Sequence, residues 1–251
     1  MAGAEFANNR KDCADHNMRA VVTSLGLSLD QVLIVGTQSA RTGFYGLAPT
    51  ELKSTGLHET QTDYAAFFAP VSEGVSLVTH MADCGFVVAE FPGVFGFLHL
   101  TRLNMAENST AARDFVHAAL AHYGGRIEDV RLTLVAAVRG ENYPQHFTDL
   151  PGHRPDDRFP GWFEAGLLTN LSKPDWRAGD PLNAADRWLP DNRAMMRRLL
   201  LRTGVSPAQV TDHAVLDPCD LRLGHASHGA GMRGHIPIAR DAYIVTPASV
   251  G

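Results

Sequence analysis

The stretch Val78–His99, which reads VTHMADCGFVVAEFPGVFGFLH, decides how this chain can fold. Two short apolar runs, Phe86–Phe91 and Val94–Leu98, flank a Pro-Gly dipeptide. Apolar runs separated by such a dipeptide predict a buried β-hairpin. Because a hairpin brings its last residue back close to its first, we expect Cys84 and His99 to be neighbours.

A cysteine beside a histidine is compatible with two kinds of chemistry. The imidazole can accept the thiol proton, and the thiolate is the form that attacks an electrophilic carbon. The same two side chains can instead be ligands of a zinc ion. Buried cysteine is most often an inert core residue, and a lone histidine is most often structural. The pair alone therefore leaves nucleophilic, metal-binding and structural interpretations open.

The motifs around this pair resemble those of a known family. MADC at 81–84 and FLH at 97–99 resemble the ADC and HAGWRG signatures of the laccase-domain family, also called the polyphenol oxidase or YfiH-type family. Further segments resemble its helices, its strands and its CT pair: Asp15–Leu27, Thr62–Phe68, Asp191–Ser206 and Asp217–Cys219. The resemblance spans most of the chain. It implies an α+β fold, a single layered α-β-β-α domain with mixed β-sheets over residues 1–251.

The resemblance also implies what the chain does. Members of the family are described as zinc-dependent purine nucleoside phosphorylases and adenosine deaminases. The same superfamily holds Cys-His deamidases of the cytotoxic necrotizing factor type and chemoreceptor deamidases, which need no metal. The family's first zinc-binding histidine falls at Ala40 and its HAGWRG arginine at Leu103. We therefore expect no cofactor; if zinc is bound, its expected ligands are Cys84, His99 and His58.

Three functions remain after this comparison of motifs. The favoured one is an enzyme, a hydrolase or transferase, in which Cys84 is the nucleophile and His99 the base. Its substrate is expected to be a small molecule with an electrophilic carbon, such as an amide or thioester, as a specialised biosynthetic step would use. The first alternative is the family's zinc-dependent purine nucleoside chemistry. The second is a relative that binds a ligand without catalysis.

Loops rich in glycine contribute the remaining candidates for substrate binding. A loop as long as Gly36–Thr55 in a compact domain is more often functional than idle. In GHASHGAGMRGH at 224–235, backbone amides can cradle an anion. The candidate substrate-binding residues are Gln38, Arg41, Arg102, Ser227, His228 and Arg233.

Composition narrows the class of protein. The chain has 251 residues, 45% of them apolar, which is enough to bury one sizeable core. A net charge of −5 with no block of Lys and Arg argues against nucleic acid as a partner. No apolar run is long enough to span a membrane, and the first residues do not resemble a signal peptide. Three widely spaced cysteines favour reduced thiols, so we expect a cytoplasmic protein. The oligomeric state stays open.

Periodicity and capping residues predict the other elements. Asp15 is an expected N-cap for a helix that runs to about Ser24, packs Val21, Val22 and Leu25, and stops at Gly26. Two more helices are expected at 111–123 and 191–203. Strands are expected at 31–35, 64–68, 75–78, 130–137 and 242–245. The segment 138–190 contains many prolines and is expected to be irregular.

Overall fold

The structure is a computed structural model. It describes residues 19–37, 43–46, 58–62, 64–81, 84–100, 104–136, 145–146, 161–162, 164–171, 187–216 and 241–247. None of the helices in these ranges has the length and apolar character needed to cross a membrane.

The predicted hairpin forms the middle of a six-stranded mixed sheet. β6 (Gly85–Phe91) pairs antiparallel with β7 (Val94–Leu100), and the turn residue Gly93 has a positive φ of 75°. The strand order is β12-β8-β6-β7-β4-β2. The other strands of this sheet are β12 (Val210–Leu216), β8 (Arg131–Ala136), β4 (Tyr64–Pro70) and β2 (Gly43–Gly46). The hairpin prediction is confirmed, and each of its strands has a neighbour on its outer side.

A second, four-stranded sheet has the order β13-β5-β1-β3. Its strands are β13 (Asp241–Val245), β5 (Ser76–Met81), β1 (Val32–Thr37) and β3 (His58–Thr62). β1 runs parallel to both β5 and β3, whereas β13 is antiparallel to β5. Both sheets are therefore mixed, as the motifs implied.

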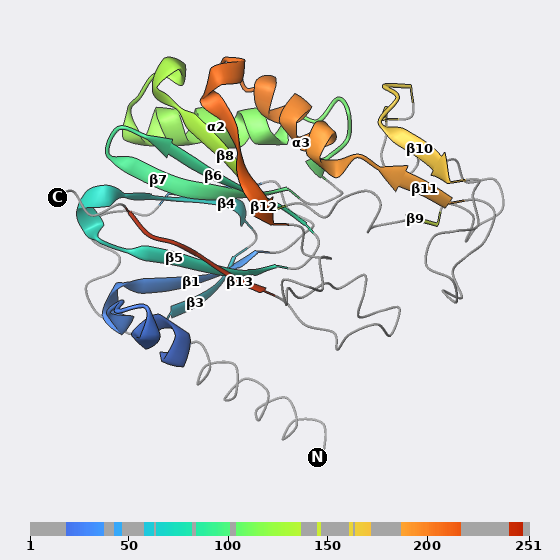
Figure 1. Ribbon diagram of the computed structural model, residues 1–251. Helices are drawn as coiled ribbons and strands as arrows, with labels where there is room; N and C mark the ends of the chain where they lie inside the picture. Colours follow the sequence, from blue (N-terminus) through green and yellow to red (C-terminus); the bar gives the residue numbers. More distant parts are fainter. Residues whose placement is uncertain are drawn as a thin grey trace, which may run out of the picture.

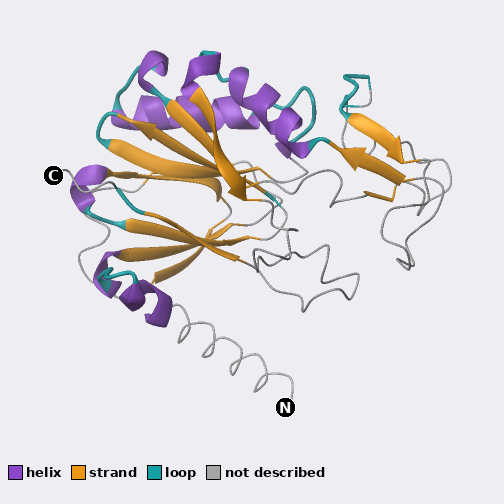
Figure 2. Cartoon of the chain, in the orientation of Figure 1, coloured by secondary structure: helices purple, strands orange, loops and turns teal. Residues whose placement is uncertain are grey.

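The two sheets pack face to face with helices on their outer sides (Figure 1, Figure 2). Aromatic side chains fill the layer between the sheets, among them Phe67, Phe86, Phe97 and Tyr243. The outer face of the six-stranded sheet is covered by α2 (Ala111–Tyr123) and α3 (Asn192–Leu201). The helical residues 19–24 cover the four-stranded sheet. This order of layers is the predicted α-β-β-α arrangement.

α2 and α3 form close to where the sequence predicts them, at 111–123 and 191–203. The expected N-cap of the first helix, Asp15, lies outside the described residues. Asp191 caps α3 by accepting a hydrogen bond from the Ala194 amide at 3.0 Å, as its type predicts. Gly26 ends the first helix with φ 73°. On that helix Val22 is fully buried, but Val21 and Leu25 are 43% and 59% exposed. The expectation that both would pack is wrong, because among the described residues of this helix, 19–24, only Val22 is buried.

The described residues between 138 and 190 are more regular than expected. They contain a small antiparallel sheet of order β10-β11-β9, made of Leu168–Leu171, Arg187–Pro190 and Gln145–His146. Trp162 is completely buried, and its indole N–H donates to the Met105 carbonyl. Strands of 2 to 4 residues are too short to show an alternating pattern in the sequence. Short 3-10 helices occur elsewhere, at Leu29–Gln31, Val71–Glu73, Ile127–Asp129 and Pro207–Gln209.

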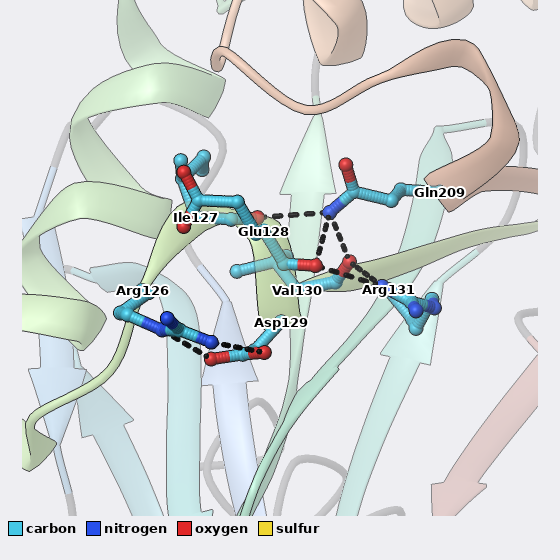
Figure 3. Close-up of polar contacts among 7 residues, drawn as sticks. All are labelled: Arg126, Ile127, Glu128, Asp129, Val130, Arg131 and Gln209. Atoms are coloured by element: carbon cyan, nitrogen blue, oxygen red, sulfur yellow. Dashed lines mark hydrogen bonds and ion pairs between the residues drawn. The ribbon is translucent and has the colours of Figure 1, made fainter.

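A single glutamine joins the starts of β8 and β12 (Figure 3). The Gln209 side-chain N–H group donates to the carbonyls of Ile127 at 2.8 Å, Glu128 at 3.2 Å and Val130 at 2.7 Å. Beside it, the Asp129 carboxylate accepts hydrogen bonds from Arg126 and raises the pKa of that guanidinium further. These contacts fix the end of the six-stranded sheet that lies opposite Cys84.

Candidate functional site

The ends of many strands meet where the chain passes from one sheet to the other. β5 ends at Met81 in the four-stranded sheet, and β6 begins at Gly85 in the six-stranded sheet. Three residue steps from Met81 to Cys84 span at most about 10 Å, so these ends lie close together. We call this the crossover end. The strand register also brings the last residue of β7, Leu100, to this end, because Leu100 pairs with Gly85.

Cys84 and His99 both lie at the crossover end. His99 lies opposite Phe86 in the β6–β7 ladder. Cys84 immediately precedes Gly85, whose ladder partner is Leu100, and so lies diagonally across from His99. Diagonal neighbours in an antiparallel ladder are separated by about 7–8 Å. The backbone register therefore brings the two residues near each other, as the hairpin pattern predicted.

The surroundings of the pair are mostly aromatic. His99 is only 5% exposed and Cys84 is half-buried. His99 shares its face of the sheet with its ladder partner Phe86, whose ring centroid lies 5.0 Å from that of Phe97 and 4.8 Å from that of Tyr243. A polar histidine in an apolar layer is costly unless it has a task or a partner. The imidazole is thus held in a nearly water-free layer, with the thiol at its edge.

Gly85 sets how closely α3 approaches the cysteine. A Cβ atom on Gly85 would overlap the sulfur and the methyl group of Met196, which is completely buried. Only glycine allows this approach. The backbone next to Cys84 is therefore held between α3 and the rest of the six-stranded sheet.

The remaining candidates for substrate binding lie outside the described residues, but the strand ends that flank them are described. Gln38 and Arg41 fall between Thr37 of β1 and Gly43 of β2, and Arg102 falls between Leu100 and Asn104. Leu216 of β12 and Asp241 of β13 flank the remaining three, Ser227, His228 and Arg233. The ladders place all of these flanking strand ends at the crossover end.

His58, the expected replacement zinc ligand, begins β3 at the other end. Its backbone pairs with Leu33, which pairs with Leu77 of β5. Leu77 lies four residues before Met81, a distance of about 13 Å along an extended strand. Among the described residues, no three His, Cys, Asp or Glu side chains are grouped as a metal site requires. Cys84 and His99 supply two donors, and a catalytic zinc usually has three protein ligands, so the described residues do not fit zinc.

One polar residue at this end was not singled out by the sequence. Thr79 of β5 is completely buried, and its hydroxyl has no hydrogen-bond partner in the part of the chain that the structure describes. A threonine within an apolar strand, five residues before the cysteine, was the available signal.

The fold matches solved structures of bacterial proteins. The hypothetical protein YfiH of Bacillus licheniformis has a TM-score of 0.64 and 14% identity, covering 92% of this chain and 79% of its own. YlmD of Geobacillus stearothermophilus has a TM-score of 0.63 and 16% identity, and the match covers 92% of this chain and 78% of YlmD. Protein NMB0706 of Neisseria meningitidis, described as DUF152, has a TM-score of 0.59 and 16% identity, and the match covers 92% of this chain and 79% of NMB0706. No protein-family model and no curated protein matches the chain. The likeness shows that this chain has the YfiH-type fold that its motifs predicted.

Proposed function

We propose that this protein is an enzyme in which Cys84 and His99 act as nucleophile and base on a small molecule with an electrophilic carbon. An amide or a thioester is the substrate class that fits best. The observation that carries the proposal is the ladder register, in which Phe86 faces His99 and Cys84 lies diagonally across from it at the edge of the aromatic layer.

The proposed reaction begins with a proton transfer. His99 accepts the thiol proton of Cys84, because a cysteine alone is only a few per cent thiolate at neutral pH. The thiolate sulfur then bonds to the carbonyl carbon of the substrate. The imidazolium returns its proton to the departing amine or thiol, which leaves a thioester on Cys84. Water or another acceptor, deprotonated by His99, takes the acyl group and restores the thiol.

The burial of the two residues supports these roles. The aromatic rings around His99 restrict the movement of its imidazole. Less orientational freedom of this base is therefore lost when the reaction begins. Cys84 is half-buried, so a substrate can reach its sulfur from the crossover end. A buried cysteine with apolar neighbours on all sides would instead be inert.

Zinc chemistry is less well supported than the metal-free pair. It would require a third ligand, and the sequence has Ala40 where the family has a histidine. The backbone of His58 begins β3 at the end away from the pair. The metal-free reaction needs only the two residues that the register brings together.

The test is the pH dependence of alkylation by iodoacetamide, followed for each cysteine by peptide mass spectrometry. We expect Cys84 to react at neutral pH at least tenfold faster than Cys13 and Cys219, and His99→Gln to remove this advantage, because a neighbouring base favours the thiolate. A transient acyl adduct on Cys84 after incubation with a panel of small thioesters would identify it as the nucleophile. Equal reactivity of all three cysteines would refute the proposal.

A further inference from the structure

We propose that Tyr243 is a specificity-determining residue, whose ring restricts the acyl group that Cys84 can carry to a small one. This inference rests on the proposed Cys84–His99 pair and deepens it, because it names the size of substrate that the site accepts. Its basis is the position of Tyr243 at the border between the closed part and the open part of the layer between the sheets.

Tyr243 stands out among the side chains of its own sheet. In the part of the chain that the structure describes, it is the one aromatic side chain that the four-stranded sheet contributes to the apolar layer. The other strands of that sheet supply aliphatic side chains such as Leu33 and Leu77. The remaining aromatic residues of the layer lie on the six-stranded sheet, and they are Phe67, Phe86, Phe95 and Phe97. A bulky ring at this position therefore narrows the layer locally.

The ring of Tyr243 closes the layer beside the proposed pair. Its centroid lies 4.8 Å from that of Phe86. Phe86 faces His99 in the β6–β7 ladder and follows Cys84 by two residues. Two residue steps span at most about 7 Å, so an acyl group on the sulfur of Cys84 takes up space beside Phe86. Across the layer, that space is bounded by Tyr243.

The layer opens on one side of this contact. β13 is an edge strand of its sheet and faces β6 through the contact between Tyr243 and Phe86. β1 contacts β4, so the four-stranded sheet extends from β13 toward β4 and away from β8. No described strand faces β8, and Val88 and Val135 are accordingly half-buried, whereas Phe97, deeper in the layer, is completely buried. Tyr243 therefore separates the filled core from the open side.

Tyrosine suits a wall at such a border. It has an apolar ring and a polar tip, and Tyr243 is 8% exposed where its neighbour Phe86 is 1% exposed. A ring in a close-packed layer does not move aside without cost. An apolar wall discriminates between substrates by size, at about 10- to 200-fold for each methylene group. The substrate class that fits is therefore an amide or a thioester of a short acyl group.

The experiment compares two reagents with the same reactive group, iodoacetamide and N-benzyl-iodoacetamide, on the full-length protein. Their rates with free cysteine correct for intrinsic reactivity. We expect Cys84 of the wild type to react at least about tenfold more slowly with the benzyl reagent. Tyr243→Leu should narrow this difference by at least about threefold, because an apolar cavity can hold a benzene ring. Tyr243→Phe, which keeps the ring, should retain the wild-type difference.

Phe95→Leu is the matched control. Phe95 belongs to the same layer and is 2% exposed, but it faces Glu90 and lies four residues before His99 on β7. Four residues of extended strand span about 13 Å. This substitution removes a ring of similar size at the far end of the layer, so Cys84 should keep the wild-type difference between the reagents. Equal effects of the two leucine variants would overturn the inference, since a general loosening of the layer would then explain both.

The outcomes separate this inference from the function on which it rests. If Cys84 reacts fast with iodoacetamide and depends on His99, but reacts equally fast with the benzyl reagent, only the role of Tyr243 is overturned. If Cys84 reacts no faster than Cys13 with iodoacetamide, the proposed function itself fails. Should Tyr243→Leu fold poorly, Tyr243→Met supplies the same comparison, because its flexible side chain fills irregular space and has no ring. An unchanged difference in that variant would also overturn the inference.

Discussion

Gly85 and Met196 are packed so closely that a side-chain carbon on Gly85 would overlap both the sulfur and the methyl group of Met196. Gly85 follows Cys84 directly, and Met196 lies on the buried face of α3. The position of the proposed nucleophile is therefore set by a helix more than a hundred residues away in the chain. The contact couples the outer helical layer to the backbone next to Cys84 at the crossover end.

Gly85→Ala should destabilise the fold by about 1–3 kcal/mol, because an added methyl group in a filled core forces neighbours to move. Since the displaced backbone carries Cys84, alkylation of this thiol at neutral pH should also slow. Urea unfolding and the alkylation assay measure the two effects.

The control for this prediction uses the partner residue. Met196→Ala creates a cavity and should cost about 2–5 kcal/mol by itself. In the double variant the new methyl group on Gly85 occupies part of that cavity. The two free-energy changes should therefore sum to more than the double variant shows. Strict additivity would mean that the two side chains do not compete for the same space.

Gln209→Ala should lower stability without changing the chemistry. Its amide donates to three backbone carbonyls at the start of β8, and their loss should cost about 1–3 kcal/mol (Figure 3). The contacts lie at the end of the six-stranded sheet opposite Cys84, so alkylation of the folded variant should match the wild type. Denaturant unfolding at neutral pH measures the loss.

A second substitution at this position tests the direction of these hydrogen bonds. Gln209→Glu has the same shape, but its carboxylate accepts and cannot donate. It should be at least as destabilising as alanine at neutral pH, and it should recover part of its stability in acid, where the carboxyl group regains a proton. If the Gln209→Glu variant is as stable as the wild type at neutral pH, donation to the carbonyls is not what stabilises this end of the six-stranded sheet.

The elements that local patterns specify were predicted well. The Pro-Gly turn between two apolar runs gave the β6–β7 hairpin, and capping residues with helical spacing gave α2 and α3. A hairpin specifies its own pairing, which is why the proximity of Cys84 and His99 was predictable from the sequence. Motif resemblance then supplied the order of the layers.

Relations between distant segments were not predictable in this way. Gly85 meets Met196 through the packing of α3 on the six-stranded sheet, so this contact leaves no local pattern in the sequence. The small sheet of β9, β10 and β11 pairs strands separated by long segments rich in proline. The burial of Val21 and Leu25 was overestimated because helical spacing gives the direction of a buried stripe but not its width.

Trp162 should anchor its segment to the loop that follows β7. Its indole donates to the Met105 carbonyl, and the guanidinium of Arg198 lies 6.0 Å from the centre of the ring. Arg198 also pairs with Glu107 at 3.0 Å. Trp162→Ala should cost about 3–5 kcal/mol by leaving a cavity.

A conservative change separates the hydrogen bond from the packing. Trp162→Phe keeps most of the apolar volume and loses the indole N–H, so it should cost clearly less than alanine. Thermal unfolding of both variants measures the difference. If phenylalanine is as destabilising as alanine, the hydrogen bond to Met105 is the main contribution of this side chain.

The last prediction concerns metal and purine nucleosides. Cys84 and His99 supply two zinc donors, the aligned family histidine is Ala40, and the backbone of His58 lies at the far end of β3. Because a catalytic zinc usually has three protein ligands, protein purified without chelator should contain much less than one zinc per chain by elemental analysis. With Leu103 at the place of the family's arginine, phosphorolysis of adenosine, inosine and methylthioadenosine should be weak or absent in a chromatographic assay with phosphate. One zinc per chain that is lost in Cys84→Ser, together with turnover of about one per second, would instead establish the zinc-dependent alternative.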